Sequence, residues 1–255
     1  FLSLTGCRER LQPAGPPAGL GISEIPQFVS LSSDDNGYSG LPGSGSEGGL
    51  HYLTGLFGAK RNPAGSGDAR TFDGTVPHFT FFVVTQYIAP ETAGLGTGEY
   101  GRGDNPVFLK RAWREAVDRG HEIGVHTHSH PHGRPLSVDQ WDEEMRLAIE
   151  ILARPWDPAE APDRPNTASG LGLSRSELPG FRAPYLEWSD AGLAAAFRRG
   201  FVYDSSLEDG PALGPHRGEF AWPYALDEGL PDHLPPVGRY PGFREVPVLN
   251  FVAPP

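Results

Sequence analysis

Short apolar runs alternate with amphipathic helical patterns along this chain. Runs of strand length occur at 28–31, 79–84, 122–125, 201–203 and 246–249, the last weakened by Pro247. Apolar residues at helical spacing predict three helices, beginning after Asn105, Ser137 and Ser189, each of which can cap a helix. Ser137 is followed by Gln140, which makes a capping box. Strands and helices in this order predict a parallel sheet with crossover helices.

Polar residues that could take part in catalysis or metal binding follow several of these strands. Asp34 and Asp35 follow the first, a histidine run follows 122–125, Arg182 stands beside a further strand, and Asp204 follows 201–203. An open doubly wound sheet and a closed β/α barrel both fit the element order. Convergence of strand ends on one point favours the barrel. We therefore predict an α/β fold, an irregular or incomplete (β/α) barrel with long loops at the C-terminal face of the strands.

Composition narrows the class of protein. The 255 residues include 34 Gly and 27 Pro, which predicts long structured loops, at 36–78, 155–180 and 205–243. Acidic residues outnumber basic ones by 32 to 21, and no basic tract is present, so nucleic acid is not an expected partner. No window approaches 18 consecutive apolar residues, as a membrane-spanning helix requires. A single Cys excludes a disulfide framework and a Cys-rich zinc module.

The ends of the sequence suggest how the chain is organised. Leu4-Thr5-Gly6-Cys7 resembles the lipobox of bacterial lipoproteins; the alternative is an ordinary buried Cys. We divide the chain into the end of a lipoprotein-like signal at 1–7, a Pro/Gly-rich tether at 8–25 and a barrel domain at 26–255, which we expect to be truncated at its C-terminus. The expected location is extracytoplasmic, as a bacterial lipoprotein or secreted protein, with membrane contact only through a lipid on Cys7.

The strongest chemical signal is the run His126-Thr127-His128-Ser129-His130-Pro131-His132. Neutral imidazole is a common metal ligand, and a catalytic zinc site needs three protein ligands and one open position. A solvated histidine tract is the alternative. It is disfavoured because the run follows an apolar strand and is interrupted by Thr, Ser and Pro. Spacing leaves open whether His126 pairs with His128 or with His130.

Two further features add to this signal. Asp34 and Asp35 at a strand end suit a division of labour between metal ligand and base, although Asp-Asp-Asn-Gly is also good turn chemistry. Arg182 lies in Gly-Phe-Arg-Ala-Pro-Tyr, and its guanidinium offers a fixed fork of donors to a carboxylate; otherwise it is a surface Arg. Asp204 is either a partner of the site or a simple cap.

Taken in order, these segments resemble the motifs of the polysaccharide deacetylases, carbohydrate esterase family 4. The first motif of that family, T-F-D-D-G, corresponds to Ser32–Gly37, where both Asp are kept and the flanks differ. The second, G-H-E-I-G followed by H-(S/T)-x-x-H, corresponds to 120–130. The third, R-x-P-Y, corresponds to Arg182–Tyr185, and a fourth region corresponds to Tyr203–Ser206. Finer likeness, at 60–63, 80–83, 222–224 and 240–242, is to animal-type chitin deacetylases and their bacterial relatives. The resemblance spans about 26–250.

The resemblance implies a site and a reaction. Asp35, His126 and His130 would hold a divalent metal, usually zinc, with cobalt as another possibility. Asp34 would be the general base for attack of water on an N-acetyl group of a polysaccharide built from N-acetylglucosamine, chitin-like or peptidoglycan-like, releasing acetate. The further implied roles are orientation of Asp34 by Arg182, oxyanion stabilisation by the backbone N–H of Tyr185, and support of the site from behind by Asp204.

The fifth motif of that family, L-x-H, which supplies the general acid, is not found. The last histidine, His233, lies in Asp-His-Leu-Pro without matching context. Truncation of the chain or loss of the acid would each account for this. Two alternatives to the deacetylase therefore stay open: a non-catalytic glycan-binding relative that keeps the metal, and another barrel metallo-amidohydrolase that uses His126 and His128 as an H-x-H pair.

Overall fold

The structure is a computed structural model that describes residues 29–64, 74–96, 103–209, 222–231, 233 and 235–249. The predicted signal end at 1–7 and tether at 8–25 lie outside the described residues. Within the described residues, no helix is both long and apolar enough to cross a membrane.

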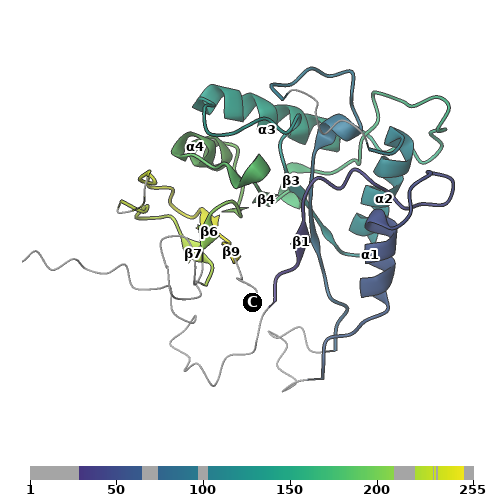
Figure 1. The fold of residues 1–255 in the computed structure, drawn as a ribbon, viewed down its shortest axis with the longest axis horizontal. Helices are drawn as coiled ribbons and strands as arrows, with labels where there is room; N and C mark the ends of the chain where they lie inside the picture. The colour runs from purple at the N-terminus through teal and green to yellow at the C-terminus, as the bar shows by residue number, and fades with distance from the viewer. Residues whose placement is uncertain are drawn as a thin grey trace, which may run out of the picture.

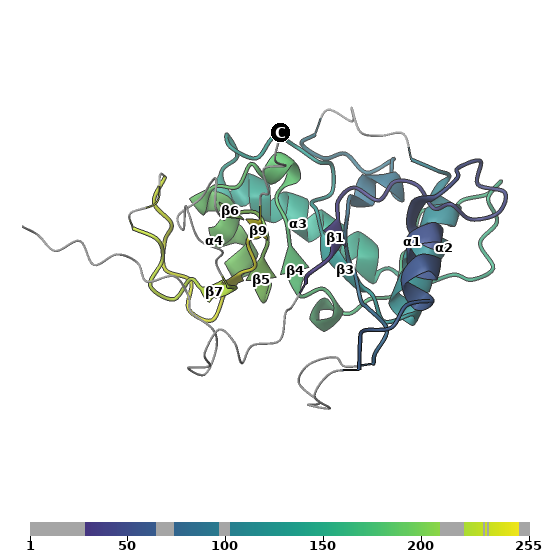
Figure 2. The same ribbon diagram turned by 60° about the horizontal axis from the view of Figure 1, so that its bottom comes forward.

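The centre of the molecule is a seven-stranded sheet in the order β1-β2-β3-β4-β5-β8-β7. The first six strands are parallel, and β7 pairs antiparallel with β8. Among the described residues β1 and β7 stand at opposite ends of this order and do not pair, so the sheet is not closed into a ring; β7, β5 and β4 can be followed across Figure 2. Their bounds are β1 Ser32–Ser33, β2 Thr80–Val83, β3 Glu122–Val125, β4 Gly180–Phe181, β5 Tyr203–Asp204, β7 Tyr224–Ala225 and β8 Arg244–Glu245. A separate parallel pair joins β6 Glu208–Asp209 to β9 Val248–Leu249.

The helices pack in two pairs around this sheet. Helix α1 (Gly49–Gly58) lies against α2 (Pro106–Asp118), and α3 (Val138–Ala153) lies against α4 (Asp190–Arg198) (Figure 1). Short 3-10 turns follow β2, precede β4 and follow β4: η3 Thr85–Tyr87, η4 Arg175–Glu177 and η5 Pro184–Leu186. This arrangement confirms the predicted incomplete (β/α) barrel.

The three predicted helix starts are confirmed. Asn105 accepts a hydrogen bond from the backbone N–H of Val107 ahead of α2. Ser137 and Gln140 form a reciprocal capping box at the start of α3. Ser189 caps α4. The apolar stripes of α2 and α3 face the sheet, where the fully buried Trp113 of α2 and Trp141 of α3 fill the core, and α4 packs on α3.

Three predicted strands are placed differently. Of the run at 201–203 only Tyr203 lies in a strand, because β5 is Tyr203–Asp204. Of the run at 28–31, residues 29–31 lie in the described part of the chain and form no strand: β1 lies at Ser32–Ser33, and Val29 is 68% exposed. The run at 246–249 is divided, because Pro247 has no N–H to donate to a ladder. The chain before it forms β8, and only Val248–Leu249 remain as β9, in the smaller sheet.

Candidate active site

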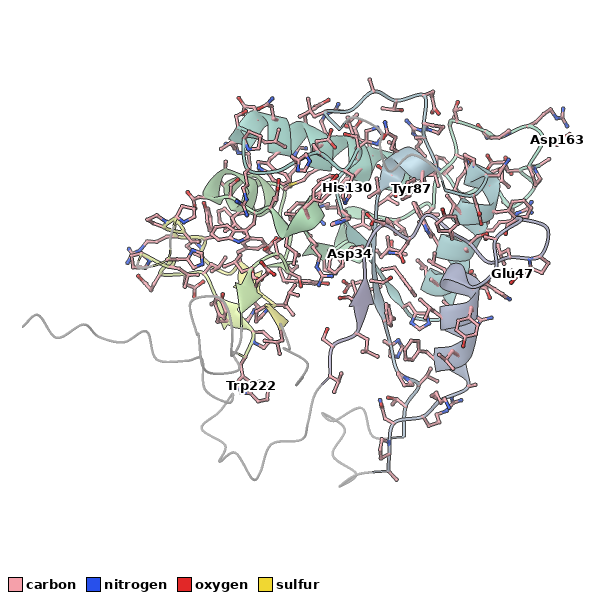
Figure 3. The ribbon with its side chains drawn as sticks, in the orientation of Figure 1. Asp34, Glu47, Tyr87, His130, Asp163 and Trp222 are labelled. Carbon is pink, nitrogen blue, oxygen red and sulfur yellow. The ribbon has the colours of Figure 1, made fainter. Side chains whose placement is uncertain are left out.

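Four parallel strands deliver the predicted site residues to one edge of the sheet. Asp34 and Asp35 follow β1, the histidine run follows β3, Arg182 follows β4, and Asp204 ends β5. In Figure 3 Asp34 lies just beyond the end of β1, with His130 beyond it. Carboxyl ends of parallel strands meet at one edge, so positions far apart in sequence become neighbours in space.

Asp35, His126 and His130 form a cluster of donor atoms. Within the described residues they are the one group of three such side chains whose ligand atoms all lie within 4.8 Å of one another. Oδ1 of Asp35 lies 3.1 Å from Nε2 of His130 and 3.8 Å from Nε2 of His126. The histidines are buried, while the Asp35 side chain keeps 37% of its surface exposed. The cluster is therefore anchored in the protein and open on one side.

The charge state of His126 suits a ligand. Its Nδ1 lies 2.8 Å from the carbonyl oxygen of Arg182, which can only accept, so Nδ1 carries the hydrogen and Nε2 keeps its lone pair. Burial lowers the pKa of His126 to about 4, which leaves the ring uncharged at neutral pH. Its contact with Asp35 is then two lone pairs facing each other at 3.8 Å, an arrangement that a cation between them would stabilise.

Asp35 is held in its ionised form. Burial alone would raise its pKa, but hydrogen bonding to His130 and the electrostatic influence of the two histidines outweigh burial and lower it. The two nitrogens and one oxygen fit a zinc-type ion: tetrahedral bonds of about 2.0–2.2 Å set donors roughly 3.3–3.6 Å apart, and the observed 3.1 and 3.8 Å bracket that spacing. The donor set leaves at least one position for water or substrate.

Asp34 points to a different partner. Nη1 of Arg182 donates to Oδ1 of Asp34 at 2.7 Å, while its Nε and Nη2 donate to the backbone oxygen and the hydroxyl of Ser205. The guanidinium also lies 4.2 Å from the centre of the Phe82 ring. The Arg182 side chain is almost fully buried, and its fork is fixed on three sides. The two adjacent carboxylates thus separate, Asp35 to the histidines and Asp34 to the arginine.

The loop that carries His130 is braced by a residue that the sequence analysis did not select. Glu144 of α3 is fully buried and accepts from the backbone N–H groups of His128 and Ser129 and from the Ser129 hydroxyl. It also accepts from Leu95 N at 2.6 Å. A signal existed: Glu144 stands on the apolar stripe of its helix beside Met145, where a charged residue needs partners.

His128 is not part of the donor cluster. Its Nδ1 contacts the hydroxyl of Thr85 at 2.9 Å, and its Nε2 contacts the carbonyl oxygen of Thr92 at 3.0 Å. Both ring nitrogens are engaged and the ring is fully buried. Of the two spacings that the sequence left open, the structure brings His126 together with His130.

Tyr185 lies at the rim of the cluster. Its backbone adopts the left-handed region, with φ of 57°, in the turn η5. Its ring contacts the His130 ring edge-on, with 4.5 Å between the ring centres, and stacks on the His132 ring, with 4.4 Å between the ring centres. Tyr185 remains 39% exposed. The turn therefore places the ring of Tyr185 beside a metal-ligand candidate.

Asp204 lies deeper than the other predicted residues. It is fully buried and accepts from the N–H and the hydroxyl of Ser206. Burial raises its pKa, and burial together with the charge of Asp204 raises the pKa of Glu245 well above its usual value. Of the two carboxyl groups, Glu245 has the more strongly raised pKa, so we assign the proton of the pair to Glu245. This carboxyl pair supports the β5–β8 end of the site, next to Ser205 and Arg182, without reaching the donor cluster.

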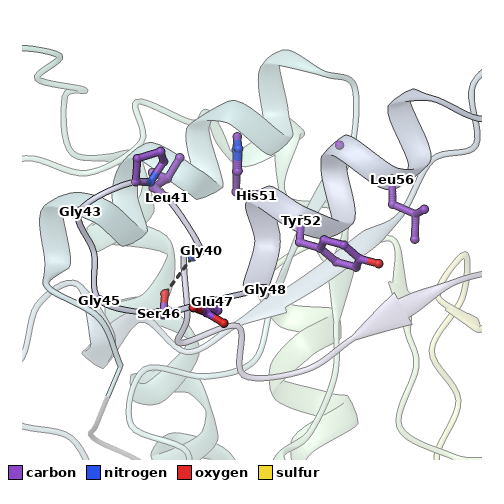
Figure 4. Close-up of a pocket in the computed structure, with 12 residues that line it drawn as sticks. Gly40, Leu41, Gly43, Gly45, Ser46, Glu47, Gly48, His51, Tyr52 and Leu56 are labelled. Atoms are coloured by element: carbon purple, nitrogen blue, oxygen red, sulfur yellow. Dashed lines mark hydrogen bonds between the residues drawn. The ribbon is translucent and has the colours of Figure 1, made fainter.

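A hollow of about 910 Å³ lies elsewhere, between loop 40–48 and the outer side of α1 (Figure 4). His51, Tyr52 and Leu56 of the helix form one wall. Its lining contains neither Asp35 nor the two histidines of the cluster. The donor cluster therefore lies outside this hollow.

Comparison with known proteins supports the motif interpretation. Residues 71–158 match the family model described as polysaccharide deacetylase. No curated protein matches the chain. Solved structures similar to the chain include a family 4 carbohydrate esterase from Streptomyces lividans in complex with acetate (19% identity over 71% of this chain and 62% of that one, TM-score 0.40). The deacetylase PplD from Streptococcus pyogenes in complex with acetate is another (15% identity over 78% of this chain and 68% of that one, TM-score 0.43).

A third similar structure is the Xyl-CE4 domain of a multidomain xylanase from the hindgut metagenome of Trinervitermes trinervoides (13% identity over 65% of this chain and 52% of that one, TM-score 0.36). The chain spans less than two thirds of the length of the Streptomyces and termite-hindgut proteins. The matched segment, 71–158, contains β2, α2, β3, the histidine run and α3. The resemblance to the polysaccharide deacetylases that the sequence motifs indicated is therefore confirmed.

Proposed function

We propose that this protein is a metal-dependent deacetylase that hydrolyses N-acetyl groups on a polysaccharide containing N-acetylglucosamine and releases acetate. One observation carries the proposal: a cluster of two histidines and one aspartate stands beside a second aspartate that Arg182 holds in place. This arrangement separates the ligands for an ion from a carboxylate that can accept a proton.

The donor set supports zinc as the metal. Zinc sites of catalytic type use three protein ligands of the histidine and carboxylate kind and keep one position open, as Asp35, His126 and His130 would. Cobalt has similar ligand preferences and is the second candidate. When bound, the ion supplies Lewis acidity toward the acetyl oxygen and increases the acidity of water.

The protein side chains divide the remaining work. Asp34 accepts a proton from the attacking water, and Arg182 keeps its carboxylate oriented. The backbone N–H of Tyr185, presented by the left-handed turn, donates to the oxygen that gains negative charge as the acetyl carbon becomes tetrahedral. Collapse breaks the C–N bond, and a proton must reach the leaving amine to give acetate and a free amino sugar.

A non-catalytic glycan-binding protein is the second candidate, and the changed flanks of the first motif, at Ser32–Gly37, favour it. Both candidates keep the metal and the glycan contact, and only the first releases acetate. The amidohydrolase alternative requires His128 as a ligand, and the contacts of His128 with Thr85 and Thr92 weigh against it.

Acetate release from an acetylated chitooligosaccharide, with and without chelator, tests the proposal. We expect release by the zinc-loaded protein, loss with chelator, and recovery on adding zinc back. His130→Ala should abolish bound metal and release, whereas His128→Ala should retain a metal site. Retention of glycan without acetate would favour the binding protein, and loss of metal only in His128→Ala would favour the amidohydrolase.

We also propose that the protein acts outside the cytoplasm, where such polysaccharides are exposed, and that Cys7 carries the lipid. Leu4-Thr5-Gly6-Cys7 supports this. Labelling the protein in a bacterial host with a fatty acid tests it: Cys7→Ser should abolish incorporation, and equal incorporation in both proteins would contradict it.

A further inference from the structure

Asp34 and Asp35 are followed by Asn36, where the related family motif usually has glycine. Both Asp35 and Asn36 adopt the left-handed backbone region, with φ of 66° and 55°. Asparagine is among the few side chains that tolerate this region, because its short amide can hydrogen-bond locally. These two residues turn the chain sharply just after β1, and this turn directs the Asp35 carboxylate toward the histidines.

The side chain of Asn36 ties the turn to two strands. Its Nδ2 donates to the carbonyl oxygen of Ser33 in β1 at 3.0 Å and to that of Phe82 in β2 at 2.9 Å. Its Oδ1 accepts from the Ser33 hydroxyl at 2.6 Å. Both amide hydrogens and the amide oxygen are thus used, and the turn is fastened to the sheet beneath it.

The backbone of Asn36 is fixed as well. Its N–H donates to the carbonyl oxygen of Asp34 at 2.8 Å. Its carbonyl oxygen accepts from Nε1 of Trp113, a fully buried residue of α2, at 3.1 Å. The residue next to the metal-ligand candidate is therefore held by the sheet on one side and by a core helix on the other.

We propose that Asn36 is the positioning residue for Asp35: it sets the carboxylate where it can share an ion with His126 and His130. The proposal rests on the metal site of the proposed function and goes beyond the ligands themselves. Glycine at 36 would permit the left-handed turn but would lose all three side-chain bonds. Alanine would lose the bonds and would also disfavour the backbone conformation.

The test is zinc affinity, measured by competition with a chromogenic chelator, alongside the melting temperature of the metal-free protein. The variants are Asn36→Gly and Asn36→Ala. The matched control is Asn105→Ala, which removes an asparagine of structural role only: it caps α2 and donates to the carbonyl oxygen of Pro162. All proteins are the full chain.

We expect Asn36→Gly to raise the zinc dissociation constant by at least about tenfold, which is the usual effect of losing a partner that orients a metal ligand. Asn36→Ala should raise the dissociation constant further. Asn105→Ala should lower the melting temperature and leave the zinc affinity within about twofold. Zinc affinity within about twofold of wild type in both Asn36 variants would overturn the proposal. So would failure of Asn36→Gly to fold, since the side chain would then serve folding.

Acetate release separates this inference from the proposed function. Wild-type protein that binds zinc with the expected ranking of variants, yet releases no acetate, would refute the deacetylase and support the role of Asn36. Wild-type protein that binds no zinc, cobalt or other divalent ion would overturn the inference directly.

Discussion

Arg182 and Asp34 are joined by a hydrogen bond of 2.7 Å, although 147 residues separate them along the chain. The carbonyl oxygen of the same arginine, at 2.8 Å, fixes the hydrogen of His126 on Nδ1. One residue therefore orients both the proposed base, through its side chain, and a proposed metal ligand, through its backbone. Side-chain substitution at 182 should separate these two effects.

Arg182→Lys should lower kcat by about 10- to 100-fold while the zinc affinity stays near wild type. A lysine keeps the positive charge but cannot reproduce the fork to Asp34 and Ser205. Steady-state kinetics and zinc titration of the same preparation measure both quantities. Arg198→Lys, at an exposed position of α4, is the control and should match wild type. An unchanged kcat in Arg182→Lys would contradict the assigned role.

Glu144→Gln should weaken both stability and zinc binding. An amide offers one accepting oxygen where the carboxylate now receives four donors, and its NH₂ would face an N–H of the His128–Ser129 backbone or of Leu95. We expect a loss of about 3 kcal/mol in the free energy of unfolding and about tenfold in zinc affinity.

The control for this prediction is the adjacent Glu143→Gln. Glu143 is half exposed and pairs only with Arg146 across one turn of α3, so its loss should change stability by less than about 1 kcal/mol. Chemical unfolding of both variants makes the comparison. Equal stability of the two would show that Glu144 does not brace the loop.

Glu245→Gln should flatten the dependence of stability on pH. The pKa of Glu245 is raised in the folded protein, so the folded state binds the proton more tightly than the unfolded chain does. Stability from this group is complete below the ordinary value near 4.5 and is lost as pH rises toward the raised pKa. Glutamine can still donate a hydrogen bond to Asp204 but does not titrate. The fall in stability that Glu245 causes with rising pH should therefore be absent from this variant.

Urea unfolding of the metal-free protein at pH values from 4.5 upward measures this effect. Wild type should lose stability relative to Glu245→Gln as pH rises. Asp204, whose pKa is also raised, contributes a dependence of the same sign that both proteins share. Parallel profiles for the two proteins would contradict the assignment of the proton to Glu245.

Lys110→Met should destabilise the protein strongly. Lys110 and Glu160 form an ion pair of 2.6 Å in which both side chains are only 1% exposed, and Ser169 binds both. Removing the lysine leaves a buried carboxylate without its counter-charge, which costs about 3–5 kcal/mol. The exposed Lys60→Met should cost less than about 0.5 kcal/mol in the same unfolding measurement. Comparable values for the two variants would contradict this interpretation.

The sequence predicted most of the framework because its signals were local. Caps at Asn105, Ser137 and Ser189 mark helix starts by their own hydrogen-bonding chemistry. Helix α1 escaped prediction for the opposite reason: Gly48 stands at its cap, it contains three further glycines, and packing against α2 stabilises it. Intrinsic propensity carries no record of such tertiary support.

In the candidate site, too, the sequence showed the residues with local signals and not those whose role depends on tertiary contacts. The ligand and base candidates were visible as motif residues, and the structure brings Asp35, His126 and His130 together as the resemblance implied. The residues that hold them were not visible, because Asn36 reads as a turn residue and Glu245 as a charge near a proline. Their roles depend on contacts with Phe82 and Asp204, which only folding creates.

The most direct test of the central claim is acetate release by wild type and by Asp34→Asn, with bound zinc measured in both. The account predicts about one zinc per chain in each protein, held by Asp35, His126 and His130. It predicts chelator-sensitive acetate release from wild type and a loss of about 10²- to 10⁴-fold in Asp34→Asn. Wild-type protein without zinc, or an Asp34→Asn variant as active as wild type, would contradict it.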